Sequence, residues 1–480
     1  MTSGGSDAVA RIETGISGLD EIASGGLPAP RSTLVAGTAG TGKTLLAVQF
    51  LVMGTERHDD SGVLVAFDEP PDEMVRNVQS LGWDLGRLVD AGRLVIVDLT
   101  PSSEESTEVG EFDLAGLLAR LENAVAKVGA KRVVLDALTA FFPRFADYSL
   151  VRRELQRLTS RLRELGVTTL ITAERAEEYG PVARYGVEEF VADNVIILRN
   201  PLEFERRRRT IEILKLRGGG HERGEFPFGI DAQRGVIVHP LAALEPAREA
   251  PVRRLSLGNA TLDEMCGGGI FSDSIALVLG PSGAGKTLTA LHFLDAGCRQ
   301  GERTVFYTFD ESSAQVARNA AAWGFDLEGP ERDGTLKIVA RYPDRLGLED
   351  LLIDIGRELG ERQPVRIVLD SLSVLERVSS GKSFREFVVG LRSLVKAHAV
   401  ATLCTYDHGV GPDRARPQFS TMVDAIVELG FVEVSGVVRR WLTVVKLRGS
   451  RHDLAIREYR IGDDGMTLLE PVEELTGLFT

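Results

Sequence analysis

The chain has 480 residues, more than one hydrophobic core usually organises, so two domains of about half that length are expected. Its 43% hydrophobic and 26% charged residues are ordinary for a folded soluble protein, and no apolar run is long enough to span a bilayer. The formal net charge of −14 opposes nonspecific attraction to nucleic acid or anionic lipid, so neither is expected as a partner.

The N-terminal segment MTSGGSDAVA has neither a basic start nor an apolar stretch. We therefore expect no secretory signal and a cytoplasmic location. Cys266, Cys298 and Cys404 lack the spacing of metal ligands and cannot all pair. Each is expected to be a reduced, buried side chain.

The segment STLVAGTAGTGKTLLAVQFL reads as an apolar strand, a glycine-rich loop and an apolar helix, and the loop matches the pattern G-x-x-x-x-G-K-[ST]. Its glycines let backbone N–H groups surround a phosphate, Lys43 would reach the terminal phosphates, and Thr44 would offer a hydroxyl to Mg²⁺. The alternative is a glycine-rich turn with an incidental lysine. The predicted ATP-binding residues of this loop are Gly37, Thr38, Ala39, Gly40, Thr41, Gly42, Lys43 and Thr44.

Carboxylates follow two of the next apolar runs. Asp68 and Glu69 come after VLVAF, and if that strand ends at Phe67 they emerge at the sheet edge where ligands bind. One could orient the water or hydroxyl that attacks the γ-phosphate, and the other could assist Mg²⁺. Asp136 ends RVVLD and could act in the second shell of the metal. The alternatives are a solvated turn at DEPPDE and a helix cap at Asp136.

Short β-rich runs such as VLVAF, LVIVDL, TTLIT and NVIIL alternate with helical segments such as VRRELQRLTSRLRELG. The pattern predicts an α/β fold, a mainly parallel sheet with helices on both faces. The basic run Arg206–Arg209 leads into TIEILKLR and is interpreted as a strand edge whose charges meet a carboxylate or a phosphate. On that strand Lys215 and Arg217 should point to one face.

The same series of segments then returns in the same order. LGNATLDEMCGGGI, SIALVLGPSGAGKTLTALHFL, VFYTFDES, RIVLDSLSVLE and VVKLRGSRHDLAIREY repeat earlier segments, which indicates a tandem duplication. Prolines and charges in LAALEPAREAPVRR mark the seam, so we expect one domain over residues 1–245 and a second over 246–480.

The second copy predicts a second nucleotide site with the same roles. Asp310 and Glu311 follow its second strand, Asp310 and Thr287 are predicted metal ligands, and Asp370 ends RIVLD. The predicted ATP-binding residues of the second loop are Gly280, Pro281, Ser282, Gly283, Ala284, Gly285, Lys286 and Thr287.

Two RecA-like copies, each with a P-loop, an acidic pair after the next strand, a D-[AS]-[LV]-[TS] segment and a terminal K-L-R-G, resemble the KaiC family of ring ATPases. The segments EEYGPVARYGVEEFVADNVIILRN, ERRRRTIEILKLRG and GSRHDLAIRE are also similar to it, and the resemblance covers nearly the whole chain. It implies a homohexameric double ring with ATP held between neighbouring subunits. It implies nucleotide contacts by Ser80, Lys215, Leu216, Arg217, His221, Trp323, Arg440, Lys446 and Arg448, with the KLRG residues and His221 acting from the next subunit. The alternatives for Ser80 and Trp323 are a helix-end serine and a core tryptophan.

Ser420 and Thr421 lie in PQFSTMVDAI. Aligning the two K-L-R-G segments places Asp424 opposite Asp193 and Ser420 opposite Glu189, so a phosphoserine would restore a negative charge that the first copy always carries. In the KaiC family an adjacent Ser-Thr pair at this place is autophosphorylated. The resemblance thus implies ATP hydrolysis in the first copy and γ-phosphate transfer to the hydroxyls of an adjoining subunit in the second, with Glu311 as general base. An unmodified surface pair is the alternative.

Two departures from the family pattern affect these expectations. Clock members typically carry Glu-Glu where this chain has Asp-Glu, and the shorter side chain withdraws the carboxylate by about 1.5 Å, which should slow turnover. The chain ends soon after GMTLLEP, whereas clock members continue into a tail that KaiA binds, so stimulation by KaiA is not expected. Binding of a KaiB-like protein to the first ring is left open.

Two other functions fit the same motifs. A RecA-type DNA-dependent ATPase would need a basic channel, which the acidic composition disfavours. A scaffold that binds ATP without turnover is disfavoured by the intact lysines and acids of both copies.

Overall fold

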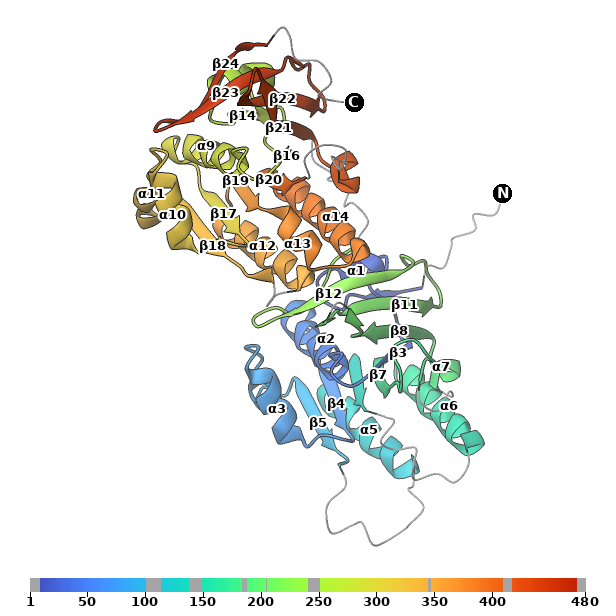
Figure 1. Cartoon of the computed structure of the whole chain (residues 1–480). Coiled ribbons are helices and arrows are strands. Elements are labelled where there is room, and N and C mark those ends of the chain that lie inside the picture. Colours follow the sequence, from blue (N-terminus) through green and yellow to red (C-terminus); the bar gives the residue numbers. More distant parts are fainter. Residues whose placement is uncertain are drawn as a thin grey trace, which may run out of the picture. The chain divides into compact units, whose positions relative to one another are not determined.

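The computed structural model folds the chain into two compact units, Met1–Pro240 and Leu241–Thr480 (Figure 1). The predicted domain boundary after residue 245 lies outside the described residues and stays a prediction. The structure describes residues 9–100, 114–137, 148–183, 188–203, 205–240, 251–343, 347–408 and 417–472.

The described strands of the first unit build a nine-stranded sheet in the order β13-β12-β11-β8-β3-β7-β6-β4-β5. The strands from β8 to β5 are parallel, and β11, β12 and β13 extend the sheet antiparallel. The bounds are β1 (Arg11–Ile12), β2 (Leu27–Pro28), β3 (Ser32–Gly37), β4 (Gly62–Ala66), β5 (Leu94–Asp98), β6 (Arg132–Asp136), β7 (Thr168–Glu174), β8 (Asn194–Arg199), β9 (Leu202–Glu203), β10 (Arg206–Arg207), β11 (Thr210–Leu216), β12 (Glu225–Asp231) and β13 (Gly235–Val238).

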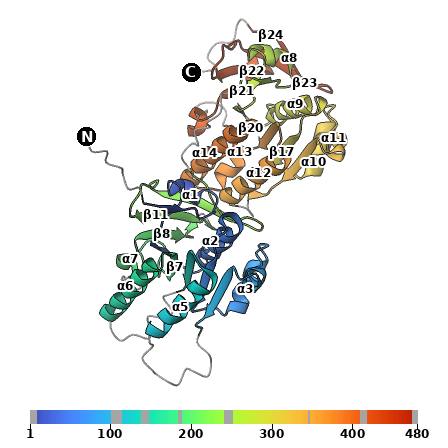
Figure 2. The same cartoon turned by 180° about the vertical axis from the view of Figure 1, so that it is seen from behind.

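Helices cover both faces of this sheet (Figures 1 and 2). Alternate strand residues, such as Val63 and Val65, form one core with α5 and α6, while α2 packs against β4, β6 and β7 on the opposite face. The bounds are α1 (Leu19–Ile22), α2 (Lys43–His58), α3 (Pro71–Gln79), α4 (Leu85–Asp90), α5 (Leu114–Val128), α6 (Tyr148–Glu164) and α7 (Glu188–Val191).

The second unit repeats this topology. Its described strands run in the order β18-β17-β19-β20-β16-β21-β22-β23-β24, with β22, β23 and β24 antiparallel. The strands are β14 (Arg254–Leu255), β15 (Ile270–Phe271), β16 (Ile275–Gly280), β17 (Thr304–Thr308), β18 (Leu336–Ala340), β19 (Arg366–Asp370), β20 (Ala401–Asp407), β21 (Ala425–Val434), β22 (Val437–Leu447), β23 (Arg457–Gly462) and β24 (Gly465–Pro471). The helices are α8 (Ala260–Met265), α9 (Lys286–Arg299), α10 (Ser313–Ala321), α11 (Glu328–Asp333), α12 (Leu348–Arg362), α13 (Leu372–Arg377) and α14 (Gly381–His398), with a 3₁₀ turn at Gln418–Thr421.

The central strand β16 is buried on both faces, which explains its continuous apolar run. Ile275, Leu277 and Leu279 pack with α12, α13 and α14, whereas Ala276 and Val278 pack with α8, α9 and α10. The predicted α/β fold with a mainly parallel sheet is confirmed, and each sheet has an antiparallel extension. The three cysteines are free; Cys266 and Cys404 are buried as expected, but Cys298 is only partly buried.

A buried arginine joins helix to sheet in each unit. Arg132 is 1% exposed; its Nε and Nη2 donate to Asp60 Oδ2 at 3.1 and 2.9 Å, and its guanidinium lies 4.6 Å from the Phe50 ring centre. Gly54 lets it pass, because a Cβ there would lie 2.3 Å from Arg132 Nε.

The second unit carries the same device. Arg366 Nε donates to Glu302 Oε2 at 2.7 Å, and its guanidinium lies 4.7 Å from the Phe293 ring centre. A Cβ at Gly297 would lie 2.6 Å from Arg366 Cδ. Because a buried charge without its partner is costly, each pair is a point where one substitution should loosen the whole unit.

Asp60→Ala should lower the free energy of unfolding of the first unit by about 3–5 kcal/mol, because it leaves the Arg132 charge buried and unpaired. Urea denaturation of the full chain measures it. The matched control is Glu56→Ala, whose half-exposed carboxylate lies 3.5 Å from Arg87 and should contribute less than about 1 kcal/mol. Equal losses for the two variants would contradict the role of the buried pair.

Candidate functional site

Both predicted P-loops form tight turns between the central strand and a helix. Gly42 and Gly285 adopt φ of 95° and 94°, in the left-handed region that favours glycine, and each immediately precedes the lysine that begins α2 or α9. The lysines fold back over their own loops, where Lys43 Nζ donates to Thr38 O at 2.8 Å and Lys286 Nζ donates to Pro281 O at 2.9 Å. The structure thus brings each predicted set of loop residues into one turn at a helix N-terminus, the geometry that binds phosphate.

The threonine hydroxyl after each lysine is hydrogen-bonded to the aspartate at the carboxyl end of β6 or β19. Thr44 Oγ1 donates to Asp136 Oδ2 at 2.9 Å, and Thr287 Oγ1 donates to Asp370 Oδ2 at 2.8 Å. Burial raises the pKa of Asp136, and burial raises the pKa of Asp370 to about 6. Asp370 is not a helix cap, because α13 begins after Ser371; the residues that follow Ala137 in the first unit lie outside the described part of the chain.

These oxygens fit the predicted magnesium ion. Mg²⁺ usually keeps several waters and takes one or two protein oxygens together with phosphate oxygens. Each site offers one threonine hydroxyl beside one carboxylate, at the N-terminal turn of the P-loop helix. Among the described residues no three His, Cys, Asp or Glu side chains are grouped as a metal site.

The acidic pairs lie at the same edge of each sheet. β4 ends at Ala66 and β17 at Thr308, one residue before Phe67 and Phe309, whose N–H groups still bond to Asp136 O and Asp370 O on the neighbouring strands. The exposed Asp68 and the partly buried Glu69 still emerge beside β6, since the charge of Asp136 contributes, after burial, to the raised pKa of Glu69.

An asparagine eight residues further along the chain, on α3 or α10, orients each glutamate. Asn77 Nδ2 donates to Glu69 Oε1, and Asn319 Nδ2 donates to Glu311 Oε1 at 3.1 Å. Burial, followed by the charge of Asp310, raises the pKa of Glu311, and burial also raises the pKa of Asp310. A carboxylate with a raised pKa is a better proton acceptor at neutral pH, as a general base requires.

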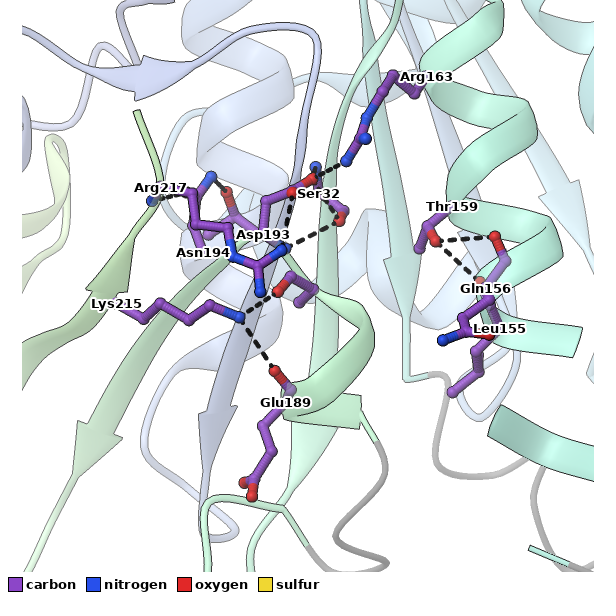
Figure 3. A network of polar contacts seen from close by, with 12 residues as sticks. Ser32, Leu155, Gln156, Thr159, Arg163, Glu189, Asp193, Asn194, Lys215 and Arg217 are labelled. Atoms are coloured by element: carbon purple, nitrogen blue, oxygen red, sulfur yellow. Dashed lines mark hydrogen bonds and ion pairs between the residues drawn. The ribbon is translucent and has the colours of Figure 1, made fainter. Parts of the chain in front are cut away.

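The KLRG residues lie at the opposite end of the sheet from the P-loop of their own unit. Lys215 Nζ donates to Ala192 O at 2.7 Å and Glu189 O at 3.4 Å, and Arg217 lies 3.8 Å from Asp193 (Figure 3). β11 ends at Leu216, so Arg217 lies just past the strand. The two cations are nevertheless close, since burial and then Arg217 lower the pKa of Lys215.

Strand register gives the separation. Leu216 pairs with Asn194, which pairs with Thr33, four residues before Gly37 on β3, so the KLRG end is about 13 Å along the strand from the P-loop. In the second unit Leu447 pairs with Ala425, which pairs with Ala276, and the separation is the same.

Ser420 and Thr421 lie beside the basic residues of the second unit. Lys446 Nζ donates to Ser420 O at 3.0 Å, and Arg448 Nη2 donates to Thr421 O at 2.5 Å. Lys446 thus contacts Ser420 as Lys215 contacts Glu189, which supports the alignment of these two positions. Thr421 is exposed and Ser420 partly buried, so both belong to a surface turn.

The structure does not bring the other predicted nucleotide contacts to the P-loop of their own unit by any hydrogen bond or ion pair among the described residues. Ser80 Oγ donates to Asn77 O at the end of α3, Trp323 packs partly buried on the core, and His221 Nδ1 lies 2.9 Å from Glu222 O. Arg440 lies over the Phe431 ring. Their roles stay predictions.

In the basic run before β11, Arg208 is buried and lies 3.7 Å from Glu203. At this residue the interpretation that the run meets a carboxylate is confirmed.

Two carboxylates near the P-loops were missed by the sequence analysis. Glu178 accepts a hydrogen bond from Thr38 Oγ1 at 2.6 Å and another from Asn200 N at 2.9 Å, which links the first P-loop to the end of β8. Asp407 lies 2.5 Å from Lys286 Nζ. The available signals were the EEYGP segment, which contains Glu178, and the carboxylates that end TTLITAE and ATLCTYD, the second of which is Asp407. None of these segments has a spacing that predicts contact with a P-loop.

Asp370→Asn should make the nucleotide-free second unit more stable than the wild type at pH 8, by about 1–3 kcal/mol, because it removes a buried carboxylate whose pKa is raised to about 6. A carboxyl whose pKa is raised on folding makes the folded state less stable as pH rises from the pKa of the unfolded chain, near 4, through the pKa of the folded state, about 6. The advantage should therefore shrink below pH 6 and vanish near pH 4. Denaturation at several pH values measures it, and a variant less stable than the wild type at pH 8 would contradict the assignment. Asp136→Asn should behave alike in the first unit.

No helix in the described part of the chain is both long and apolar enough to cross a membrane.

Comparison with known proteins matches both units to one family. The family model for the KaiC ATPase matches residues 12–243 and again 256–473. The chain is 47% identical over 476 residues to the circadian clock protein KaiC3 of Synechocystis sp., covering 98% of this chain and 94% of that protein. It is 48% identical over 461 residues to the circadian clock oscillator protein KaiC of Synechococcus elongatus, covering 95% and 89%, and 47% identical over 475 residues to that of Acaryochloris marina, covering 98% and 91%. Two matches of the family model and near full-length identity show that this chain is a member of the KaiC ATPase family.

Proposed function

We propose that the chain hydrolyses ATP in its first unit and transfers the γ-phosphate of ATP to Thr421 and Ser420 in its second, within a homohexameric double ring. The relatives named as circadian clock proteins support a role in circadian-type or other signalling regulation. ATP and Mg²⁺ are the proposed cofactors. A KaiB-like protein is the proposed partner, and the cytoplasm is the proposed location.

The observation that carries the proposal is the position of the hydroxyls. Ser420 and Thr421 lie with Lys446 and Arg448 about 13 Å along the strand direction from the P-loop of their own unit. A nucleotide on that P-loop is therefore badly placed for these groups. A P-loop of a neighbouring subunit, facing the KLRG edge, would bring phosphate, cations and hydroxyls together.

In the first unit, Lys43 and the backbone N–H groups of residues 37–42 would bind the phosphates. Glu69, oriented by Asn77, would accept the proton of the attacking water, and Asp68 would assist in binding Mg²⁺. Thr44 and Asp136 would hold Mg²⁺, which when bound neutralises charge on the phosphates. Lys215 and Arg217 of the next subunit would stabilise charge on the transferring phosphoryl group.

In the second unit the acceptor is a protein hydroxyl. The Thr421 hydroxyl of the neighbouring subunit would attack the γ-phosphorus, the bond to the β–γ bridging oxygen would break, and ADP would leave. Glu311, oriented by Asn319, would take the hydroxyl proton. Phosphorylation of Ser420 would place negative charge where the first unit carries Glu189, beside a lysine in both units.

The DNA-dependent motor is not favoured, because the family match covers both units and the chain is acidic. If the chain is not such a motor, addition of single-stranded DNA should leave its rate of ATP turnover unchanged.

Incubation of the wild type with Mg-ATP should add one or two phosphates, and Ser420→Ala combined with Thr421→Ala should abolish them. Intact-mass analysis at several temperatures measures this. For transfer between subunits, Lys286→Ala chains should gain phosphate only when mixed with the double-alanine chains, which donate but cannot accept. An unchanged wild-type mass would remove the kinase and leave the hydrolase, whereas a Lys286→Ala chain that stays unmodified in the mixture would indicate transfer within one chain.

A further inference from the structure

The P-loop lysine of the second unit is paired with a carboxylate, and that of the first unit is not. Lys286 Nζ lies 2.5 Å from Asp407 Oδ1, with the lysine side chain 8% exposed and the aspartate side chain 39% exposed. No ion pair joins Lys43 to a carboxylate within the described ranges; its ammonium donates to Thr38 O. A carboxylate is also near the first lysine, since burial lowers the pKa of Lys43 and the charge of Glu174 raises it. Among the described residues, however, only the second lysine is in direct contact with its carboxylate.

Asp407 is held in this position from two sides. Its Oδ2 accepts hydrogen bonds from Ser373 Oγ at 2.9 Å and Ser371 Oγ at 3.3 Å. Burial raises the pKa of Asp407, but the hydrogen bond and charge of Lys286 outweigh burial and leave the pKa below its ordinary value, so the group is ionised at neutral pH.

The first unit has a different side chain at the same place. Asp407 ends β20 opposite Gly280 on β16, just as Glu174 ends β7 opposite Gly37 on β3. Ala137 follows Asp136 where Ser371 follows Asp370, so the first unit has no hydroxyl equivalent to that of Ser371, which donates to Asp407 in the second unit. The two units thus differ both in the acidic residue at this strand end and in the residues that donate hydrogen bonds to it.

In a P-loop site the lysine reaches the β- and γ-phosphates. Either nucleotide draws the Lys286 ammonium away from Asp407 through its β-phosphate, but only a triphosphate also places the charge of a γ-phosphate beside that carboxylate. We propose that Asp407 is a specificity-determining residue of the second nucleotide site, which shifts its preference from ATP towards ADP relative to the first site. The inference rests on the proposed nucleotide binding and extends it.

The test uses the full chain in a Lys43→Ala background, so that binding reports the second site. Isothermal titration with ADP and with the non-hydrolysable triphosphate AMP-PNP, both with Mg²⁺, gives the ratio of the two dissociation constants. Asp407→Asn should shift this ratio about tenfold towards the triphosphate, mainly through tighter AMP-PNP binding, since the isosteric amide keeps the shape and removes the charge. Ser373→Ala, which removes one support, should give a smaller shift in the same direction.

Glu174→Gln in a Lys286→Ala background is the matched control, and it should change the ratio less than about twofold because no ion pair to the lysine is lost. A thermal melt of each variant checks folding. A ratio unchanged by Asp407→Asn, with both nucleotides still binding, would overturn the role of Asp407 and leave the nucleotide site intact. Absence of any binding in the Lys43→Ala background would refute the second nucleotide site, and the proposal with it.

Discussion

The hydrogen bond between the hydroxyl that follows each P-loop lysine and a buried strand-end aspartate, Thr44 to Asp136 and Thr287 to Asp370, ties the loop to the sheet in both units. It can form because parallel strands end at one edge of a sheet, so a loop after β3 and a carboxylate at the end of β6 meet there although α3, α4 and α5 lie between them in sequence. The acidic pairs after β4 and β17 reach the same edge for the same reason. The bond keeps a carboxylate buried at a cost in stability, which a site prepared for a metal and a phosphate would explain.

The two units keep this frame and differ around it. Thr38, bonded to Glu178, occupies the loop position that Pro281 occupies in the second unit, where no side-chain hydroxyl is available. Asp407 pairs with the second lysine, and a serine replaces a glutamate beside Lys446. These changes surround the phosphate site or the KLRG edge rather than the core, as expected if duplication preserved the fold and selection altered the chemistry.

Much of the fold could be predicted because it depends on local patterns. Apolar runs bounded by glycine and charge gave the strands, and β16 shows why: its residues alternate between two helical layers and are apolar throughout. The P-loops and the aspartates that end β6 and β19 could be predicted because each signal lies within a single segment, either one glycine-rich loop or the end of one apolar strand. The pairing of Asp407 with Lys286 could not be found, because it joins the end of β20 to the start of α9, far apart in sequence, and depends on the register of β20 against β16. The distance of Lys215 from its own P-loop is also a matter of register, since the residue type says only that a cation is present.

The central claim is that one chain carries two nucleotide sites built on equivalent loops. Equilibrium dialysis of the full chain with AMP-PNP and Mg²⁺ measures the number of sites most directly. The account predicts two nucleotides bound per wild-type chain and one for Lys43→Ala or Lys286→Ala alone, because each lysine serves only its own loop. A wild-type chain that binds a single nucleotide, or a count that stays at two when either lysine is removed, would contradict it.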